Sequence, residues 1–292
     1  MKVTIVADYF MKDMPMGGSE RSLQAIIDAA PMPVKLVRSS EFRLRDYEQD
    51  DFLIFGNFRQ LPYGILSTIA KKVKYAVIES DYKYCCYMEI ETHERSTGRR
   101  CDCHEKDYGQ RICDFYDGAE IIFWKSTAQL NRHLEAFPIL KLKENIVIGA
   151  TYSDDELSFL LEVAKRRWIK FGWAVFKSDH WIKGYPQAVQ YCKDHKLWRI
   201  DIRNKSWVKS ILRFAKCKGL VFMPQIMESC SRVTLEAHIL GLDVRVNDNV
   251  PVVMEPWFKW PREKIVEHIR KQPKLFWECI KRVTHENIVG AT

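Results

Sequence analysis

Short runs of apolar residues alternate with amphipathic segments along most of the 292-residue chain. In the segment 19–30, for example, Leu23, Ile26, Ile27 and Ala30 follow the spacing of one helix face. Apolar runs between such segments predict buried strands, and this alternation is typical of β-α-β units with a largely parallel sheet. The predicted strands of the first half are 2–7, 34–37, 52–57, 74–79 and 120–126, and the predicted helices are 19–30, 61–72 and 127–137.

The same alternation begins again near residue 154. Two consecutive α/β runs predict two Rossmann-like domains, residues 1–152 and 153–292. The last segment, 262–283, is predicted to be helical with an interruption at Pro273, and its final part to pack back on the first domain. The other predicted elements are helix 155–167, strand 171–176, a helix after 187, strand 197–202, helix 206–216, strand 219–224, helix 231–240 and strand 243–247.

Composition indicates a folded chain, with 47% hydrophobic and 29% charged residues. No stretch approaches the roughly 18 consecutive apolar residues that a transmembrane helix needs. The nine cysteines lack the spacing of a disulfide framework, which favours a reducing compartment. We therefore expect a cytoplasmic protein; its oligomeric state is left open.

The net charge of +8 is unevenly distributed. Residues 1–150 hold 21 Lys and Arg against 22 Asp and Glu, whereas residues 151–292 hold 25 against 16, a net charge of +9. This asymmetry points the second half toward an anionic partner, either the phosphates of a small ligand or a nucleic acid. The alternative is a solvated basic surface.

The stretch MESCSRVTLEAHILG, residues 227–241, holds two glutamates eight positions apart. Glu228 follows a predicted strand, at the edge where open α/β sheets bind ligands, and Glu236 lies farther along the next helix. Ser229 or Ser231 can cap that helix, whose free N–H groups would form an anion site. Those N–H groups belong to the residues around Cys230, Ser231, Arg232 and Val233. A nucleotide sugar, with hydroxyls at both ends and a diphosphate between, fits this layout; the alternative is a solvated loop residue and an ordinary helix residue.

Together with the preceding strand, Pro224, Glu228, Glu236-Ala237 and Gly241 resemble the donor-binding segment of retaining glycosyltransferases of family-4 type. The resemblance implies the GT-B fold, in which two Rossmann-like domains face a central cleft, with the acceptor domain first and the donor domain second. It also implies that Glu228 contacts the transferred sugar and that Glu236 contacts the ribose of a nucleotide-diphosphate sugar. Family members usually carry an aromatic-Gly pair where this chain has Cys230-Ser231.

Two further segments carry the resemblance. In FGWAVFKSDHWIKGYPQAVQ, residues 171–190, the family's usual basic pair falls on Lys177 and Lys183, although the first is commonly arginine. Two lysines at the carboxyl end of a strand can neutralise a leaving nucleoside diphosphate; alternatively both are solvated. In MPMGGSERS, residues 14–22, Gly17 and Gly18 would allow positive φ and close approach to a ligand, with Ser19 capping the first helix.

A cysteine-rich insert, residues 81–116, interrupts the alternation with a long polar segment. Such a segment needs a staple, and a structural tetrahedral zinc held by Cys85, Cys101, Cys103 and Cys113 would supply one. His93 and His104 are substitute ligands. The alternatives are reduced thiols in a mobile acceptor loop or an iron-sulfur cluster.

Asp81 and Glu79 end a predicted strand just before the insert and are candidates for orienting an acceptor hydroxyl, although Asp81 can equally cap a loop. If the resemblance holds, the chain transfers a sugar with retention and requires no catalytic metal, because lysines and helix amides stabilise the departing diphosphate. The acceptor would be a glycan, a lipid-linked or small-molecule hydroxyl, or a hydroxylated base in DNA, as in phage enzymes that glucosylate modified cytosine. A zinc-stapled nucleic-acid-binding protein with a vestigial donor site is the alternative from another class.

Overall fold

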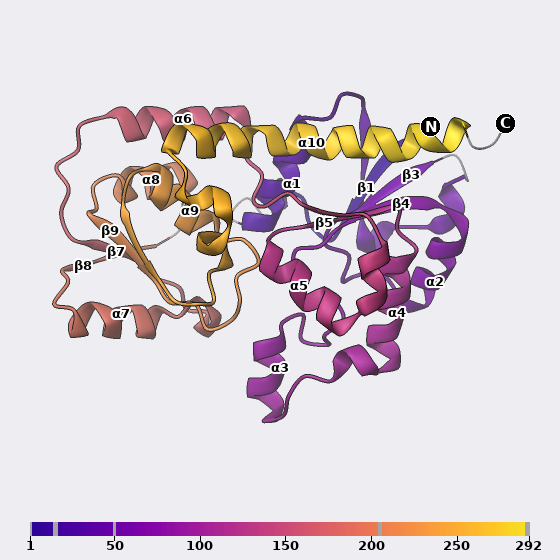
Figure 1. Cartoon of the computed structure of the whole chain (residues 1–292), viewed down its shortest axis with the longest axis horizontal. Helices are drawn as coiled ribbons and strands as arrows, with labels where there is room; N and C mark the ends of the chain where they lie inside the picture. Colours follow the sequence, from indigo (N-terminus) through magenta and orange to yellow (C-terminus); the bar gives the residue numbers. More distant parts are fainter. Residues whose placement is uncertain (1, 14–16, 49–50, 204–205, 290–292) are drawn as a thin grey trace. The chain divides into compact units, whose positions relative to one another are not determined.

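The computed structural model describes residues 2–13, 17–48, 51–203 and 206–289. Two compact units divide the chain: the first comprises Met1–Thr151 with Gln272–Thr292, and the second comprises Tyr152–Lys271. Each unit contains one parallel β-sheet with helices around it (Figure 1). The predicted α/β architecture with two consecutive parallel sheets is confirmed.

Among the described residues, the first unit contains a six-stranded sheet in the order β2-β1-β3-β4-β5-β6. Strand β1 pairs in parallel with β2 on one side and with β3 on the other. The direction in which strands are added therefore reverses between β1 and β3, and ligands of open α/β sheets bind at such a switch point. The strands are β1 (Val3–Ala7), β2 (Val34–Arg38), β3 (Phe52–Phe55), β4 (Lys74–Ile78), β5 (Ile121–Trp124) and β6 (Asn145–Val147).

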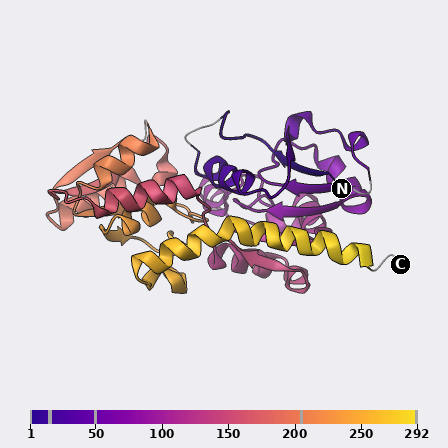
Figure 2. The same cartoon turned by 90° about the horizontal axis from the view of Figure 1, so that it is seen from above.

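Helices cover both faces of this sheet because successive strand residues point to opposite sides. Ile5 and Ile54 share one hydrophobic cluster with Ile26 of α1 and with Phe276 and Ile280 of α10. The part of α10 (Arg262–Val289) from residue 272 onward lies along this face (Figure 2). The helices within 1–151 are α1 (Gly18–Asp28), α2 (Tyr63–Lys72), α3 (Ile90–Thr97), α4 (Asp107–Asp117) and α5 (Thr127–Ala136).

The opposite face of the first sheet carries aromatic side chains. Phe55 and Tyr75 contact Phe115 of α4, with ring centroids 5.2 and 4.7 Å apart. Helices α3 and α4 both form within the polar segment that the sequence pattern indicates to be an insert. The expectation of a segment that only interrupts the α/β pattern is therefore wrong, because Ile112, Phe115 and Tyr116 recur at helical spacing and are buried.

In the second unit, the described residues contain a four-stranded parallel sheet in the order β10-β9-β7-β8. Strand β7 pairs with β8 on one side and with β9 on the other, so the switch point lies between β7 and β9. The elements are α6 (Asp154–Lys165), β7 (Trp173–Phe176), α7 (Tyr185–Asp194), β8 (Arg199–Ile202), α8 (Trp207–Phe214), β9 (Gly219–Phe222), α9 (Arg232–Ile239) and β10 (Asp243–Val246).

Helix α10 continues through Pro273, so the predicted interruption is wrong. A proline inside a helix removes one N–H bond and usually kinks or breaks the helix. Here the flanking turns are fixed by burial on both sides: Ile265, Val266 and Ile269 before the proline, and Phe276 and Trp277 after it. The free energy gained by packing these side chains thus outweighs the free-energy cost of a proline inside the helix.

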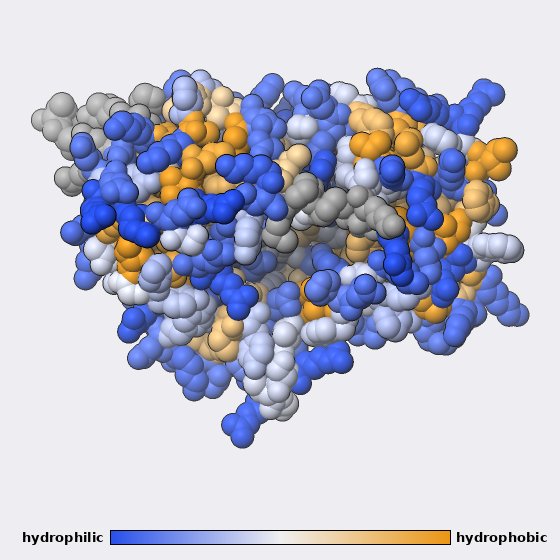
Figure 3. Space-filling view, turned by 180° about the vertical axis from the view of Figure 1, so that it is seen from behind, coloured by the Kyte–Doolittle hydropathy of each residue, from blue (hydrophilic) through white to orange (hydrophobic). Residues whose placement is uncertain are grey.

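The surface is largely polar. On the face drawn in Figure 3, hydrophilic residues dominate and hydrophobic residues occur in separate patches. Within the described part of the chain, no helix is both long enough and apolar enough to cross a membrane.

Candidate functional site

The loops after β7 and β9 meet at the switch point of the second sheet. Lys183 ends a short 3-10 helix, Trp181–Lys183, in the loop after β7, and Glu228 lies in the loop after β9. The Lys183 Nζ lies 2.6 Å from Glu228 Oε1. Their side chains are 32% and 15% exposed, so the pair is open to a ligand. The structure therefore brings together two of the residues that the sequence predicts, 45 positions apart.

Backbone contacts hold the loops after β7 and β9 together. The Gln225 N–H donates to the Ile182 carbonyl over 2.8 Å, which joins the two loops directly. Gly184, next to Lys183, has φ +64°, and a Cβ there would lie 1.6 Å from the Met223 carbonyl oxygen. Only glycine satisfies both the left-handed conformation and the close approach. On the other side, Glu228 N–H donates to the Asn249 carbonyl over 2.9 Å.

Lys177 lies at the same edge of the sheet, directly after β7, and faces β8. Its Nζ is 3.8 Å from Asp201 Oδ2 and 5.5 Å from the centre of the Tyr185 ring. Tyr185 Oη also donates to Asp201 over 2.7 Å. Lys177 thus stands beside the site with its own carboxylate partner, whereas Lys183 and Glu228 form the pair at its centre.

Helix α9 begins beside this pair. Of the two proposed caps, Ser231 is the one used: its Oγ accepts from Thr234 N–H at 3.4 Å. Cys230 and Val233 are partly exposed, so this end of the helix reaches the surface. A helix N-terminus favours a negative charge nearby because its first N–H groups and its dipole point outward.

The side chains of Arg232 and Glu236 turn inward instead. Arg232 lies 3.7 Å from the centre of the Tyr152 ring and 2.9 Å from Glu156. Glu236 is 4% exposed, and its Oε1 accepts from Trp207 Nε1 over 2.8 Å. These two side chains therefore bind α9 to α6 and α8, a packing role that the sequence pattern did not reveal.

The first unit has a small pocket at the switch point of its own sheet. Residues after β1, β3, β4 and β5 line it together with the start of α1, among them Asn57, Ser80, Lys125, Ser19 and Glu20. Burial is the largest influence on Glu20 and raises the pKa of that carboxyl. The pocket thus combines a glutamate that holds its proton more tightly with polar donors and acceptors.

The glycine pair before α1 acts differently from the expectation. Gly17 is the N-cap, with φ −73°, and Ser19 is a residue of the helix whose Oγ donates to Glu20. A Cβ on Gly17 would meet only side-chain atoms of Glu20, with Oε2 at 1.7 Å, and this flexible side chain can move aside, so neither positive φ nor space requires a glycine here. Residues 14–16 of the same motif lie outside the described residues.

Asp81 lies at the edge of a buried charge network in the first unit. Lys83 Nζ bonds Glu79 Oε1 at 2.7 Å and lies 3.7 Å from Asp81 Oδ2; Glu79 also accepts from Tyr116 Oη. Burial has the largest effect on Asp81 and raises the pKa of its carboxyl. The positive charge of Lys83 lowers this pKa, but by less. Burial opposes the charge on Lys83, but Glu79 and Asp81 together raise its pKa. Lys83 was missed in the sequence because nothing in its position shows that it is buried.

The cysteine cluster differs from the predicted zinc ligand set. Cys85 and Cys103 belong to it, but Cys86 and His93 complete it among the described residues. The Cys101 Sγ lies 3.7 Å from Cys85 Sγ, outside the group of four, and Cys113 is buried elsewhere on α4. His104 pairs with Glu105.

No protein-family model matches this sequence, and neither does any curated protein. Among solved structures, a crystal structure of a GtfA/B complex is similar with 11% sequence identity and a TM-score of 0.49, over 82% of this chain and 59% of that one. This chain therefore spans about three fifths of that relative's length. A crystal structure of Anabaena HepE in complex with UDP and glucose is similar with 12% identity and a TM-score of 0.49, over 100% of this chain and 99% of that one.

Proposed function

We propose that this chain is a glycosyltransferase of the GT-B type, which transfers a sugar from a nucleotide-sugar donor to an acceptor hydroxyl. The Lys183–Glu228 pair carries the proposal. It lies at the switch point of a parallel sheet, beside a helix N-terminus, which is where such sheets bind nucleotides.

Lys183 has two alternative partners in this scheme. Without donor it bonds Glu228 at 2.6 Å. When a donor binds, the ammonium group of Lys183 binds the diphosphate, and Glu228 accepts hydrogen bonds from hydroxyls of the sugar. Each charge-assisted bond of this kind contributes about 1.5–3 kcal/mol. Lys177 and the first amides of α9 add positive potential on either side.

We propose that transfer proceeds with retention of the anomeric configuration, as the family resemblance implies. The chemical task of the protein is then to stabilise negative charge on the departing diphosphate. Lysine side chains and helix amides supply this stabilisation, so a divalent cation is not required in the scheme. The resemblance assigns the ribose to Glu236, but its carboxylate points inward to Trp207 and Arg232, so this scheme gives it no contact with the donor.

The acceptor hydroxyl is assigned to the first unit, where Asp81 and Glu20 lie around the carboxyl ends of β1 and β4. A carboxylate with a raised pKa is a better acceptor for the hydroxyl proton. The proposed acceptors are a glycan, a lipid-linked or small-molecule hydroxyl, and a hydroxylated base in DNA; the net charge of +9 lies on residues 151–292, the proposed donor side, and therefore does not select among them.

The test is sugar transfer by Lys183→Ala and Glu228→Gln with DNA, glycan and small-molecule acceptors offered in parallel. Both variants are expected to lose at least about 100-fold in kcat/KM, because Lys183→Ala removes a charge that stabilises the departing diphosphate and Glu228→Gln removes the charged acceptor for the sugar hydroxyls. Folding should be preserved, since a partly exposed ion pair contributes about 0–1 kcal/mol to stability.

The matched controls are Lys271→Ala and Glu267→Gln. These residues form an exposed pair with the same 2.6 Å separation, on α10. They should transfer sugar like the unaltered chain. Near-normal turnover in Lys183→Ala or Glu228→Gln would reject the assignment of this site.

A further inference from the structure

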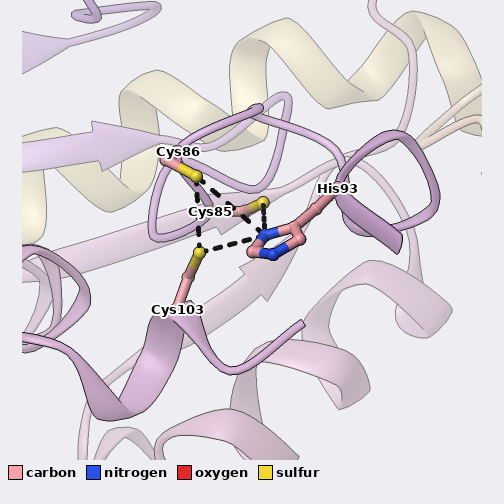
Figure 4. A group of neighbouring side chains, drawn as sticks. All are labelled: Cys85, Cys86, His93 and Cys103. Atoms are coloured by element: carbon pink, nitrogen blue, oxygen red, sulfur yellow. Dashed lines mark hydrogen bonds between the residues drawn. The ribbon is translucent and has the colours of Figure 1, made fainter. Parts of the chain in front are cut away.

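Four metal-binding side chains from separate segments converge below the carboxyl end of β4. Cys85 and Cys86 lie in the turn 82–88, His93 lies on α3, and Cys103 begins the short helix before α4. Their three Sγ atoms and one ring nitrogen all lie within 4.8 Å of one another (Figure 4). Three of the four residues are buried, and Cys86 is exposed.

Four of the six separations within the group are close to the edges of a tetrahedron around one ion. Zinc–sulfur and zinc–nitrogen bonds of about 2.3 and 2.0–2.1 Å give edges of roughly 3.8 Å between two sulfurs and roughly 3.6 Å between sulfur and nitrogen. The Cys86 and Cys103 sulfurs are 3.6 Å apart. The Nδ1 of His93 lies 3.6, 3.9 and 3.2 Å from the sulfurs of Cys85, Cys86 and Cys103.

The donor set selects the metal. Three thiolates and an imidazole, without a carboxylate, suit zinc, whereas magnesium and calcium prefer oxygen ligands. Four protein ligands also complete a tetrahedral shell and leave no position for a reacting water, so the site is structural. A polynuclear iron-sulfur cluster would hold its ligands farther apart than one shared ion does. Direct thiol contacts alone would not explain the convergence, because S–H groups are weak donors.

We propose that Cys85, Cys86, His93 and Cys103 bind one structural Zn²⁺ that fixes the segment between β4 and α4. Three thiols release their protons to the solvent when the ion binds, and His93 coordinates through Nδ1 in its neutral form. This proposal concerns folding of the first unit and does not depend on the donor site.

The position of the ion relative to the acceptor residues follows from the chain. Cys85 lies two residues after Lys83, which bonds Glu79 in the buried network next to Asp81. Tyr108 of α4 donates to the Lys83 carbonyl over 2.5 Å, and a Cβ on Gly109 would lie 2.0 Å from the Cys103 carbonyl oxygen. The ion would therefore link the loop that carries Asp81 to α3 and α4.

The turn that presents Cys85 and Cys86 shows local strain. Met88 has φ +63°, a left-handed conformation that is uncommon for a residue with a side chain. Cys85 and Met88 close the turn through a 2.8 Å backbone hydrogen bond. Such a conformation persists where the surroundings hold it in place, as two adjacent metal ligands would.

The first experiment measures zinc in the purified chain and then exchanges it for Co²⁺. We expect one zinc per chain, and for Co²⁺ both thiolate-to-metal absorption and the intense visible bands of tetrahedral geometry. Cys103→Ser should lose stoichiometric zinc, and the matched control Cys113→Ser, a buried cysteine of the same insert, should keep it. If Cys103→Ser does not fold, the Co²⁺ spectrum of the unaltered chain decides the question.

A second pair of variants separates the two ligand sets. Cys86→Ser is expected to weaken zinc binding at least 10-fold in a chelator competition, whereas Cys101→Ser should retain one ion per chain. Zinc-free protein, octahedral or sulfur-free Co²⁺ spectra, or loss of the ion in Cys101→Ser or Cys113→Ser but not in Cys86→Ser would each overturn the proposal. Iron in place of zinc, with a cluster absorption, would overturn it too.

Discussion

The ion pairs of this protein differ in how deeply they are buried, and the role that we assign to each pair follows from its burial. The side chains of Lys83 and Glu79 are 2% and 0% exposed, so their charges are fixed partners whose loss would leave a buried charge unpaired. Lys183 and Glu228 have the same chemistry but are partly exposed, at 32% and 15%, and there we propose that an anionic ligand replaces the carboxylate. The sequence singled out Lys183 and Glu228 separately, from their places after strands and from the family resemblance, but did not predict that they pair. It could not identify the first pair, because burial of a lysine depends on tertiary packing.

The buried residue His133 predicts how the stability of the protein depends on pH. Burial among Tyr82, Tyr84 and Trp124 lowers the pKa of this imidazole to about 3, from an ordinary value of 6.5. The unfolded chain therefore binds a proton below pH 6.5 that the folded chain does not. The free energy of unfolding should fall as pH drops from about 6.5 toward 3, by up to about 1.4 kcal/mol per unit for this residue.

Chemical denaturation across that pH range, on the unaltered chain and on His133→Phe, measures the effect. The variant should show a shallower dependence on pH, even if its stability at pH 7 is lower. Parallel curves for the two proteins would contradict the buried neutral state of His133.

At the scale of elements, the apolar strands and most amphipathic helices were predictable, whereas helices α3 and α4 were not. Strands such as β3 and β9 are buried along their whole length, so their residues form continuous apolar runs. Helix α4 buries only one side, and its charged remainder looked like a loop. The continuity of α10 through Pro273 was also hidden, since it depends on packing that lies outside the local sequence.

The loop between β7 and α7 gives a prediction at this scale. Gly184→Ala should lower the free energy of unfolding by more than about 2 kcal/mol, because a Cβ must adopt φ +64° and collide with the Met223 carbonyl. Because this loop positions Lys183, the folded fraction should also lose transfer activity. Gly64→Ala, on α2 with no neighbour within 4 Å of the added Cβ, is the control. It should leave the free energy of unfolding unchanged or raise it by up to about 1 kcal/mol; an equal loss of stability in the two variants would contradict this role of Gly184.

At the scale of the whole molecule, each unit places its candidate residues at a switch point of a parallel sheet. That arrangement was predictable in outline, because residues at the carboxyl ends of neighbouring strands meet at one edge. The inward orientation of the Arg232 and Glu236 side chains was not predictable, because their burial depends on Tyr152 and Trp207 from distant segments. The membership of the cysteine cluster was predictable in part, since Cys85 and Cys103 were expected and His93 was named as a substitute ligand, but Cys86 was not. Cys86 and His93 join the cluster only because the turn 82–88 and helix α3 direct them there.

The most direct measurement is thermal unfolding of the unaltered chain and of Lys183→Ala against a panel of nucleoside diphosphates and nucleotide sugars. One nucleotide should stabilise the unaltered chain saturably, by about 2.7 kcal/mol at a concentration of 100 Kd, and its effect should be largely lost in Lys183→Ala. A panel that leaves the unaltered chain unchanged, or that stabilises both proteins equally, would contradict a diphosphate site at Lys183 and Glu228.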